Sequence, residues 1–129
     1  MTDIIKKKVL LVDDDSFLLN MYMLKFEKSS FEVVSASSGQ EAITKIKEGF
    51  KPDVIVCDVI MPEIDGVKLL EMIKEQHLAD GAKRVVLSNQ GDGADIERAK
   101  KIGVDGYIVK ATSIPSEVVR LVQEILDKK

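Results

Sequence analysis

The chain has 129 residues, a formal net charge of −3 and 45% hydrophobic residues, which is typical of one globular domain. No apolar run approaches the ~20 residues of a membrane-spanning helix, and the slight excess of acidic over basic residues disfavours a general nucleic-acid binder. The single cysteine excludes an internal disulfide and favours a reducing compartment, so we expect a cytoplasmic protein.

Short apolar runs alternate with helix-like segments five times along the chain. The runs are three or four residues long and cover Val9–Val12, Phe31–Val34, Val54–Cys57, Val85–Leu87 and Tyr107–Val109. Runs that are apolar at consecutive positions are typical of strands buried on both faces of a parallel sheet. The pattern therefore predicts a (βα)5 α/β fold, with a doubly wound parallel five-stranded sheet and right-handed crossovers.

Apolar residues recur at helical spacing between the predicted strands. We expect the following groups to face the core: Phe17, Met21 and Leu24; Ile43 and Ile46; Val67, Leu70 and Ile73; Ile96, Ala99 and Ile102; Val118, Val122 and Ile125. Helix N-caps are predicted at Asp15, Ser38 and Asp65. Helix C-caps in the left-handed conformation are predicted at Gly49, Gly81 and Gly103.

Polar residues follow or end four of the predicted strands. Asp13 and Asp14 follow the first strand, Asp58 the third, Ser88 the fourth and Lys110 the fifth. Because ligands of an open parallel sheet bind beyond the carboxyl ends of its strands, we expect these side chains to converge at one edge.

Three carboxylates at one edge require a compensating cation. Two carboxylates about 4 Å apart repel by roughly 4 kcal/mol at an effective dielectric constant near 20. Asp13, Asp14 and Asp58 therefore predict a divalent ion, and Mg²⁺ fits because it takes one or two carboxylates and keeps several waters. Ser88 can donate to a phosphoryl oxygen, and Lys110 can neutralise its charge.

These residues form a pattern that resembles the receiver domain of two-component response regulators. The resemblance rests on Val12-Asp13-Asp14, Asp58-Val59-Ile60-Met61-Pro62-Glu63-Ile64-Asp65-Gly66, Ser88 and Gly106-Tyr107-Ile108-Val109-Lys110. It implies the flavodoxin-like receiver fold with sheet order 2-1-3-4-5, in which the weak run at 31–34 is an edge strand. It also implies a single-domain, chemotaxis-type receiver over residues 1–129, with a core at about 8–126 and no output domain.

The resemblance implies a phosphoacceptor switch rather than an enzyme. Asp58 would accept a phosphoryl group from the phosphohistidine of a partner histidine kinase or phosphotransfer protein. Mg²⁺ would be held by Asp13, Asp14, Asp58 and the backbone carbonyl of Ile60. An apolar Ile60 cannot orient an attacking water, so we also expect slow self-dephosphorylation.

The resemblance also implies how the signal is passed on. Ser88 and Lys110 would bind the phosphoryl oxygens, and Ser88 and Tyr107 would act as switch residues. The face made by the fourth helix, fifth strand and fifth helix would then change its contacts with a downstream protein. Neither nucleic acid nor a membrane would be a direct partner.

Two positions depart from the family pattern and keep alternatives open. Ala111 stands where a proline usually follows the lysine, and Asn89 where a small residue usually follows the serine. A phosphorylation-independent adaptor on the same fold is therefore one alternative. A haloacid-dehalogenase-like phosphatase is another, because Asp13-Asp14-Asp15 contains its D-x-D motif, although no later acid pair or cap segment is present. A flavodoxin-like FMN carrier is disfavoured, since three aspartates would repel the phosphate.

Overall fold

The structure is a computed structural model that describes residues 6–88, 93–110 and 114–128. Five strands alternate with five helices: β1 Lys8–Val12, α1 Ser16–Lys28, β2 Glu32–Ala36, α2 Gly39–Lys47, β3 Val54–Asp58, α3 Gly66–Glu75, β4 Lys83–Ser88, α4 Gly93–Ile102, β5 Gly106–Val109 and α5 Pro115–Asp127. All strand pairs are parallel, and the order in the sheet is β2-β1-β3-β4-β5. The predicted fold class and sheet order are confirmed.

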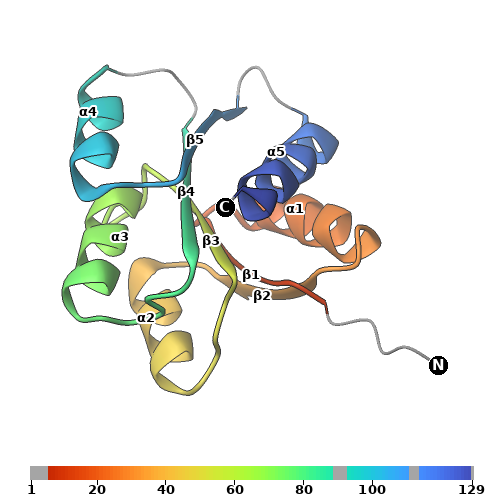
Figure 1. Cartoon of the computed structure of the whole chain (residues 1–129), viewed down its shortest axis with the longest axis horizontal. Coiled ribbons are helices and arrows are strands. Elements are labelled where there is room, and N and C mark those ends of the chain that lie inside the picture. Colours follow the sequence, from red (N-terminus) through yellow and green to blue (C-terminus); the bar gives the residue numbers. More distant parts are fainter. Residues whose placement is uncertain (1–5, 89–92, 111–113, 129) are drawn as a thin grey trace.

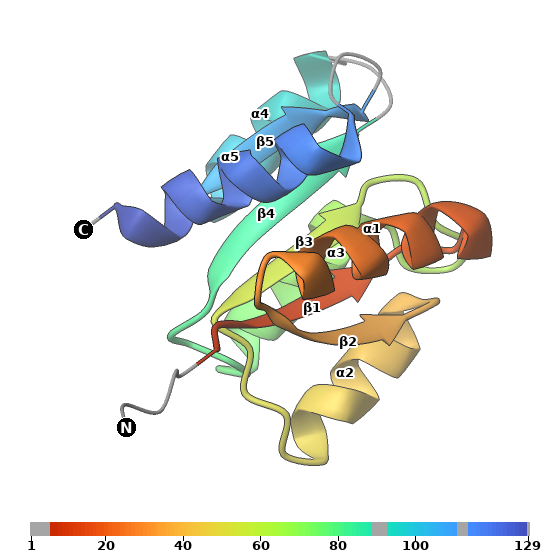
Figure 2. The ribbon, with the colours of Figure 1, turned by 90° about the vertical axis from the view of Figure 1, so that its right-hand side faces the viewer.

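Helices cover both faces of the sheet. Helices α1 and α5 lie on one side, and α2, α3 and α4 lie on the other (Figures 1 and 2). Along β1, Val9 and Leu11 belong to the core under α1 and α5, whereas Leu10 and Val12 belong to the core under α2, α3 and α4. Because successive side chains alternate between two covered faces, the middle positions of the central strands are apolar at consecutive residues.

The buried face of α1 differs from the prediction. Phe17 and Leu24 are 72% and 59% exposed, and Met21 is only half-buried. The residues that face the sheet are Leu19, Tyr22 and Phe26. Helix α1 carries apolar residues on two faces, so periodicity alone does not identify the inner one.

The predicted inner faces of the other four helices agree with the structure. Their fully buried members are Ile43, Ile46, Val67, Leu70, Ile73, Ala99, Ile102, Val118 and Val122. Ile96 and Ile125 are half-buried at the margins of these faces.

The helix ends match the predicted caps with one exception. The carboxylate of Asp15 accepts hydrogen bonds from the amides of Phe17 and Leu18, and Ser38 and Asp65 cap α2 and α3 in the same way. Gly49 and Gly103 have φ angles of 117° and 79°. The prediction for Gly81 is wrong, because the first left-handed residue after α3 is His77, with φ 55°.

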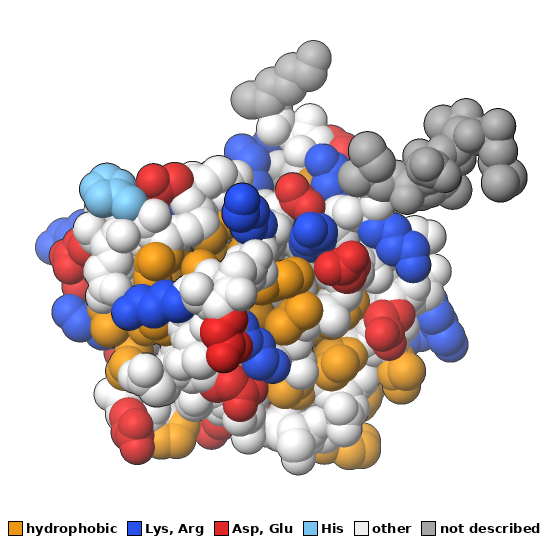
Figure 3. Space-filling view, turned by 90° about the horizontal axis from the view of Figure 1, so that it is seen from below, with side chains coloured by type: hydrophobic (Ala, Val, Ile, Leu, Met, Phe, Trp, Pro, Cys, Tyr) orange, Lys and Arg blue, Asp and Glu red, His pale blue; other side chains and the backbone are white. Residues whose placement is uncertain are grey.

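Strand β2 forms one edge of the sheet, as the weak apolar run 31–34 indicated. Its middle residues Val33, Val34 and Ser35 are half-buried, and Lys45 of α2 donates to the Ser35 carbonyl. From the side of β2 and α2, hydrophobic side chains lie among charged ones (Figure 3). A lysine next to an edge strand disfavours pairing with another chain.

Candidate functional site

The buried polar groups of the protein gather at the carboxyl edge of the sheet. Within residues 6–88, 93–110 and 114–128, the buried residues with polar or charged side chains are Asp13, Asp58 and Ser88, which are 3%, 6% and 5% exposed. A buried carboxylate is costly unless positive charge or hydrogen bonds compensate it. Two of them at one edge therefore require such compensation.

Strand geometry places the charged side chains of this edge on the same side of the sheet. Asp13, Asp58 and Lys110 each come two residues after a side chain of the core under α1 and α5, namely Leu11, Val56 and Ile108. Side chains two residues apart share a face of a strand. Strands with apolar middle residues thus bring three charged groups together at the carboxyl edge of the sheet.

Lys110 compensates both buried carboxylates. Its Nζ donates to Asp13 Oδ2 at 2.9 Å and lies 3.3 Å from Asp58 Oδ1. The three side chains are only 4–8% exposed. The second oxygen of Asp13 accepts from the Asp15 amide at 2.9 Å, so both oxygens of Asp13 are hydrogen-bonded.

The electrostatic environment shifts the protonation of this pair. Burial raises the pKa of Asp58; the charge and hydrogen bond of Lys110 oppose this rise, and the charges of Asp13 and Asp14 add to it. Burial alone would lower the pKa of Lys110, but its hydrogen bonds and the charges of Asp13 and Asp58 outweigh that effect and raise it. Lys110 is therefore a cation at neutral pH.

The three aspartates fit a hard divalent cation. Asp13, Asp14 and Asp58 each offer an oxygen, and these oxygens lie within 4.8 Å of one another. Asp14 is exposed, so the group is open to water on one side. Carboxylates from a few residues together with waters match the coordination of Mg²⁺. The Ile60 carbonyl stays a predicted ligand, and the Ile60 side chain is 69% exposed.

The loop between β3 and α3 is packed tightly behind Asp58. A Cβ atom on Gly66 would lie 2.0 Å from the Asp58 carbonyl oxygen, so only glycine fits there. The Gly66 amide donates to the Val59 carbonyl at 2.8 Å. Asp65 accepts from the Lys68 amide at 2.8 Å and begins α3. The Asp65-Gly66 pair of the motif thus has a structural role: Asp65 caps α3, and Gly66 allows the close approach to Asp58.

Other predicted residues lie around this edge. Ser88 ends β4, and Tyr107 is half-buried against the core under α2, α3 and α4. Asn89 and Ala111, the two departures from the family pattern, lie outside the described residues. Cys57 is buried beneath Asp58, and burial raises the pKa of its thiol.

Two residues near the site carry no sequence motif. Tyr22, on the inner face of α1, is 4% exposed. Burial raises the pKa of its hydroxyl, on which the charges of Lys110, Asp13 and Asp58 also act. Arg98 of α4 pairs with Asp65 at 2.9 Å. Knowledge of the inner face of α1 was needed to find Tyr22, and the contact between α3 and α4 was needed to find Arg98.

A hollow in the surface lies away from these groups. It has a volume of about 330 Å³, joins the ends of α1 and α5 at the amino edge of the sheet, and is lined by Lys7, Ser29, Ser30, Phe31, Gln123, Leu126 and Asp127. It contains none of the clustered aspartates. In the described part of the chain, no helix combines the length and apolarity that a membrane crossing requires.

Comparison with known proteins finds similar sequences and structures over nearly the whole chain. The response regulator receiver domain family matches residues 9–123. The chemotaxis protein CheY of Thermotoga maritima is 36% identical over 120 residues, which cover 92% of this chain and 97% of that protein. A putative response regulator from Chloroflexus aurantiacus has a TM-score of 0.85 at 31% identity, covering 96% of this chain and 100% of that one.

A longer relative shares only this domain. The alkaline phosphatase synthesis transcriptional regulatory protein PhoP of Bacillus subtilis is 34% identical over 120 residues. The match covers 93% of this chain and 48% of PhoP. The chain thus spans about half the length of PhoP and nearly all of CheY.

Proposed function

Because the chain belongs to the response regulator receiver domain family, we propose that it is a phosphoacceptor switch in which Asp58 takes a phosphoryl group from a phosphohistidine. The donor is a histidine kinase or a histidine phosphotransfer protein. One observation carries the proposal: the Asp58 carboxylate lies at the carboxyl edge, 3.3 Å from the Lys110 ammonium and within an oxygen cluster with Asp13 and Asp14.

The transfer is an in-line displacement on phosphorus. An oxygen of Asp58 forms the new P–O bond while the P–N bond of the donor breaks, and the imidazole leaves with the electron pair of that bond. Such a reaction needs positioning and charge neutralisation more than covalent help. Lys110 and the Ser88 hydroxyl, both at this edge, supply a positive charge and a donor for the phosphoryl oxygens.

The cluster of Asp13, Asp14 and Asp58 would hold magnesium, together with the Ile60 carbonyl. What the ion supplies when bound is positive charge that offsets the repulsion between the Asp58 carboxylate and an anionic phosphoryl group. The Ile60 side chain offers no polar group that could orient water, so the acyl phosphate is expected to hydrolyse slowly.

The readout is a change in protein contacts. Ser88 ends β4 five positions before α4 begins, and Tyr107 lies in β5, the strand that pairs with β4. A shift of the Ser88 hydroxyl towards the phosphoryl group, with a change at Tyr107, alters the face of α4, β5 and α5. This is a local change of charge that biases a two-state element. The chain acts as a cytoplasmic regulatory domain that is labelled once rather than turning over.

Phosphorylation by acetyl phosphate in Mg²⁺ tests the proposal. Mass spectrometry should show one added phosphoryl group on the wild type and none on Asp58→Asn. The matched control is Asp80→Asn, at an exposed aspartate beyond α3, which should be labelled like the wild type.

Two outcomes would contradict the proposal. If the wild type stays unlabelled while the donor remains intact, the phosphorylation-independent adaptor is favoured. Many turnovers of a chromogenic phosphomonoester would favour a phosphatase instead.

Transfer from a phosphorylated histidine phosphotransfer protein then tests the nature of the physiological donor.

A further inference from the structure

We propose that Arg98 of α4 is a positioning residue which, through Asp65, holds α4 and the loop after Asp58 in their unphosphorylated arrangement. The inference rests on the proposed function and names a residue that regulates it. It concerns one ion pair between two helices, the Arg98–Asp65 pair, whose members are 33 positions apart in the chain.

The Arg98–Asp65 pair connects α4 to the start of α3. Nη2 of Arg98 lies 3.1 Å from Oδ1 and 2.9 Å from Oδ2 of Asp65. Nη1 lies 3.5 Å from Asp95 Oδ1, one turn earlier in α4, which holds the guanidinium in place. Asp65 Oδ1 also accepts from the Lys68 amide, so the same carboxylate caps α3.

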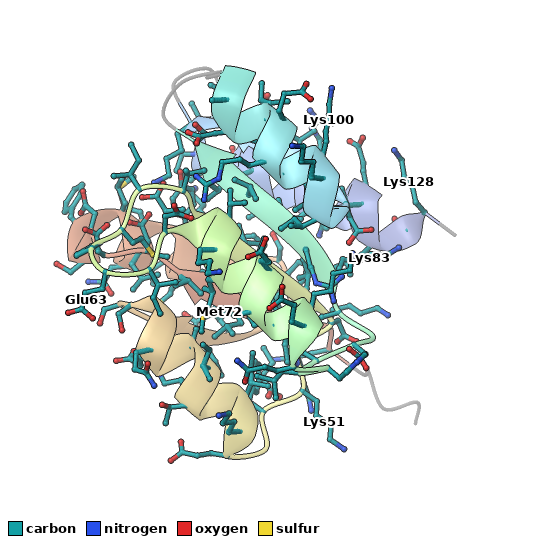
Figure 4. The ribbon with its side chains drawn as sticks, turned by 90° about the vertical axis from the view of Figure 1, so that its left-hand side faces the viewer. Lys51, Glu63, Met72, Lys83, Lys100 and Lys128 are labelled. Carbon is teal, nitrogen blue, oxygen red and sulfur yellow. The ribbon has the colours of Figure 1, made fainter. Side chains whose placement is uncertain are left out.

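Asp65 is joined to the backbone that surrounds Asp58. It ends the β3–α3 loop, which includes Glu63 (labelled in Figure 4), and it precedes Gly66, which packs against the Asp58 carbonyl. The Gly66 amide also donates to the Val59 carbonyl. A displacement of Asp65 therefore reaches the phosphoacceptor through one tightly packed residue.

Helix α4 depends on polar contacts more than the other helices do. Its fully buried residues are Ala99 and Ile102 alone, whereas α3 buries five residues and α5 three. Helices α3 and α4 lie side by side (Figure 4). Besides the Arg98–Asp65 pair, Lys74 of α3 donates to the Ile102 carbonyl at 2.8 Å, at the far end of α4. An element with little buried apolar surface is readily displaced.

The direction of the effect follows from the connection between Ser88 and α4. Ser88 is buried at the edge, and α4 begins five positions later at Gly93. When Ser88 moves to bind a phosphoryl oxygen, the first turns of α4 are drawn with it. The Arg98–Asp65 pair anchors those turns to α3, so it favours the unphosphorylated arrangement and lowers the affinity for a phosphoryl group.

Calorimetric titration with beryllofluoride in Mg²⁺ measures this affinity, since beryllofluoride mimics a phosphoryl group on a carboxylate. Arg98→Ala should bind about two- to fivefold more tightly than the wild type, which is the range that a half-exposed ion pair supports. Asp65→Ser keeps an N-cap and should give a similar gain. The double variant should gain no more than either single one, because both remove one interaction.

Control variants separate positioning from general stability. Arg98→Lys keeps the charge and should restore most of the wild-type affinity. Arg120→Ala removes another exposed arginine, which pairs with Glu124 within α5, and should leave the affinity unchanged. Urea unfolding of each variant establishes that it is folded. If Arg98→Ala is not folded, Arg98→Gln takes its place in the titration.

The possible results lead to different conclusions. An unchanged or weaker affinity of the folded Arg98 variant overturns the inference, even if its unfolding free energy falls. If the wild type itself does not bind beryllofluoride, the proposed function fails independently of Arg98.

Discussion

The Lys110 ammonium provides the positive charge between two buried carboxylates. Its ammonium lies 2.9 Å from Asp13 and 3.3 Å from Asp58. Lys110 and Asp13 are 97 positions apart in the sequence. Because Asp13 and Asp58 are buried, water solvates their carboxylates poorly, and the charge of Lys110 compensates them instead. The lysine thus has two tasks, to neutralise the resting site and to bind a phosphoryl oxygen under the proposed function.

Removal of this charge should destabilise the protein in a way that magnesium reverses. We expect Lys110→Met to lower the free energy of unfolding by about 3–5 kcal/mol in a chelator, since two buried carboxylates lose their partner. The loss should shrink in millimolar Mg²⁺, measured by urea unfolding. Lys101→Met, at an exposed position of α4, should change stability by less than about 0.5 kcal/mol. Equal losses with and without Mg²⁺ would contradict this account of the site.

At the scale of elements, α1 shows how a helix with two apolar faces is oriented. Its N-cap Asp15 is held by the chain that leaves β1, and its inner face packs Leu19, Tyr22 and Phe26 on the sheet. Phe26 also meets Phe31 edge-on, with ring centroids 5.1 Å apart. These contacts with the sheet and with the segment before β2 leave Phe17 on the outer face.

Two phenylalanines of this one helix test the orientation. Phe26→Ala should cost about 3–5 kcal/mol of unfolding free energy, because it removes a fully buried ring. Phe17→Ala should stay within about 0.5 kcal/mol, because that ring is 72% exposed. Urea midpoints of both variants decide between the faces. A large cost at Phe17 together with a small one at Phe26 would mean that α1 is rotated in solution.

For the whole molecule, the carboxyl edge is where the fold gives up stability for chemistry. The two cores are apolar throughout, and the buried charges of the described residues are confined to this edge. A raised pKa of Asp58 means that the folded state binds its proton more tightly than the unfolded state does, for which the pKa is about 3.9. The Asp58 carboxylate therefore becomes less costly to folding as the pH falls from neutrality through the folded-state value.

The pH dependence of global stability should report this cost. As the pH falls from 7 towards the unfolded-state pKa of about 3.9, in a chelator, the unfolding free energy of the wild type should gain on that of Asp58→Asn, which has no proton to take up at this position. Urea titrations at several pH values measure the difference. If the two curves of unfolding free energy against pH run parallel, or if the variant gains on the wild type as the pH falls, the pKa of Asp58 is not raised by burial.

Much of the fold and of the site could be predicted from the chain, because the signals are local. Strands appear as consecutive apolar residues, and the polar residue that follows each strand must lie at the carboxyl edge of a parallel sheet. The same reasoning predicts that Asp13, Asp14 and Asp58 lie together, and in the structure one carboxylate oxygen of each lies within 4.8 Å of the others. The left-handed residue that ends α3 is His77, whereas the sequence predicted Gly81. A histidine at this position gives no local signal of a left-handed turn, because glycine is the residue that usually adopts it.

Local patterns in the chain predict the five βα units and the polar set at one edge, and the resemblance to receiver domains implies the order of the strands. The packing of the helices on the sheet establishes the buried face of α1, the carboxylates that Lys110 contacts and the pairing of Arg98 with Asp65. The physical reason is range. Periodicity and strand ends depend on residues a few positions apart, whereas these contacts join groups 33 to 97 residues apart and depend on how the helices pack across the sheet.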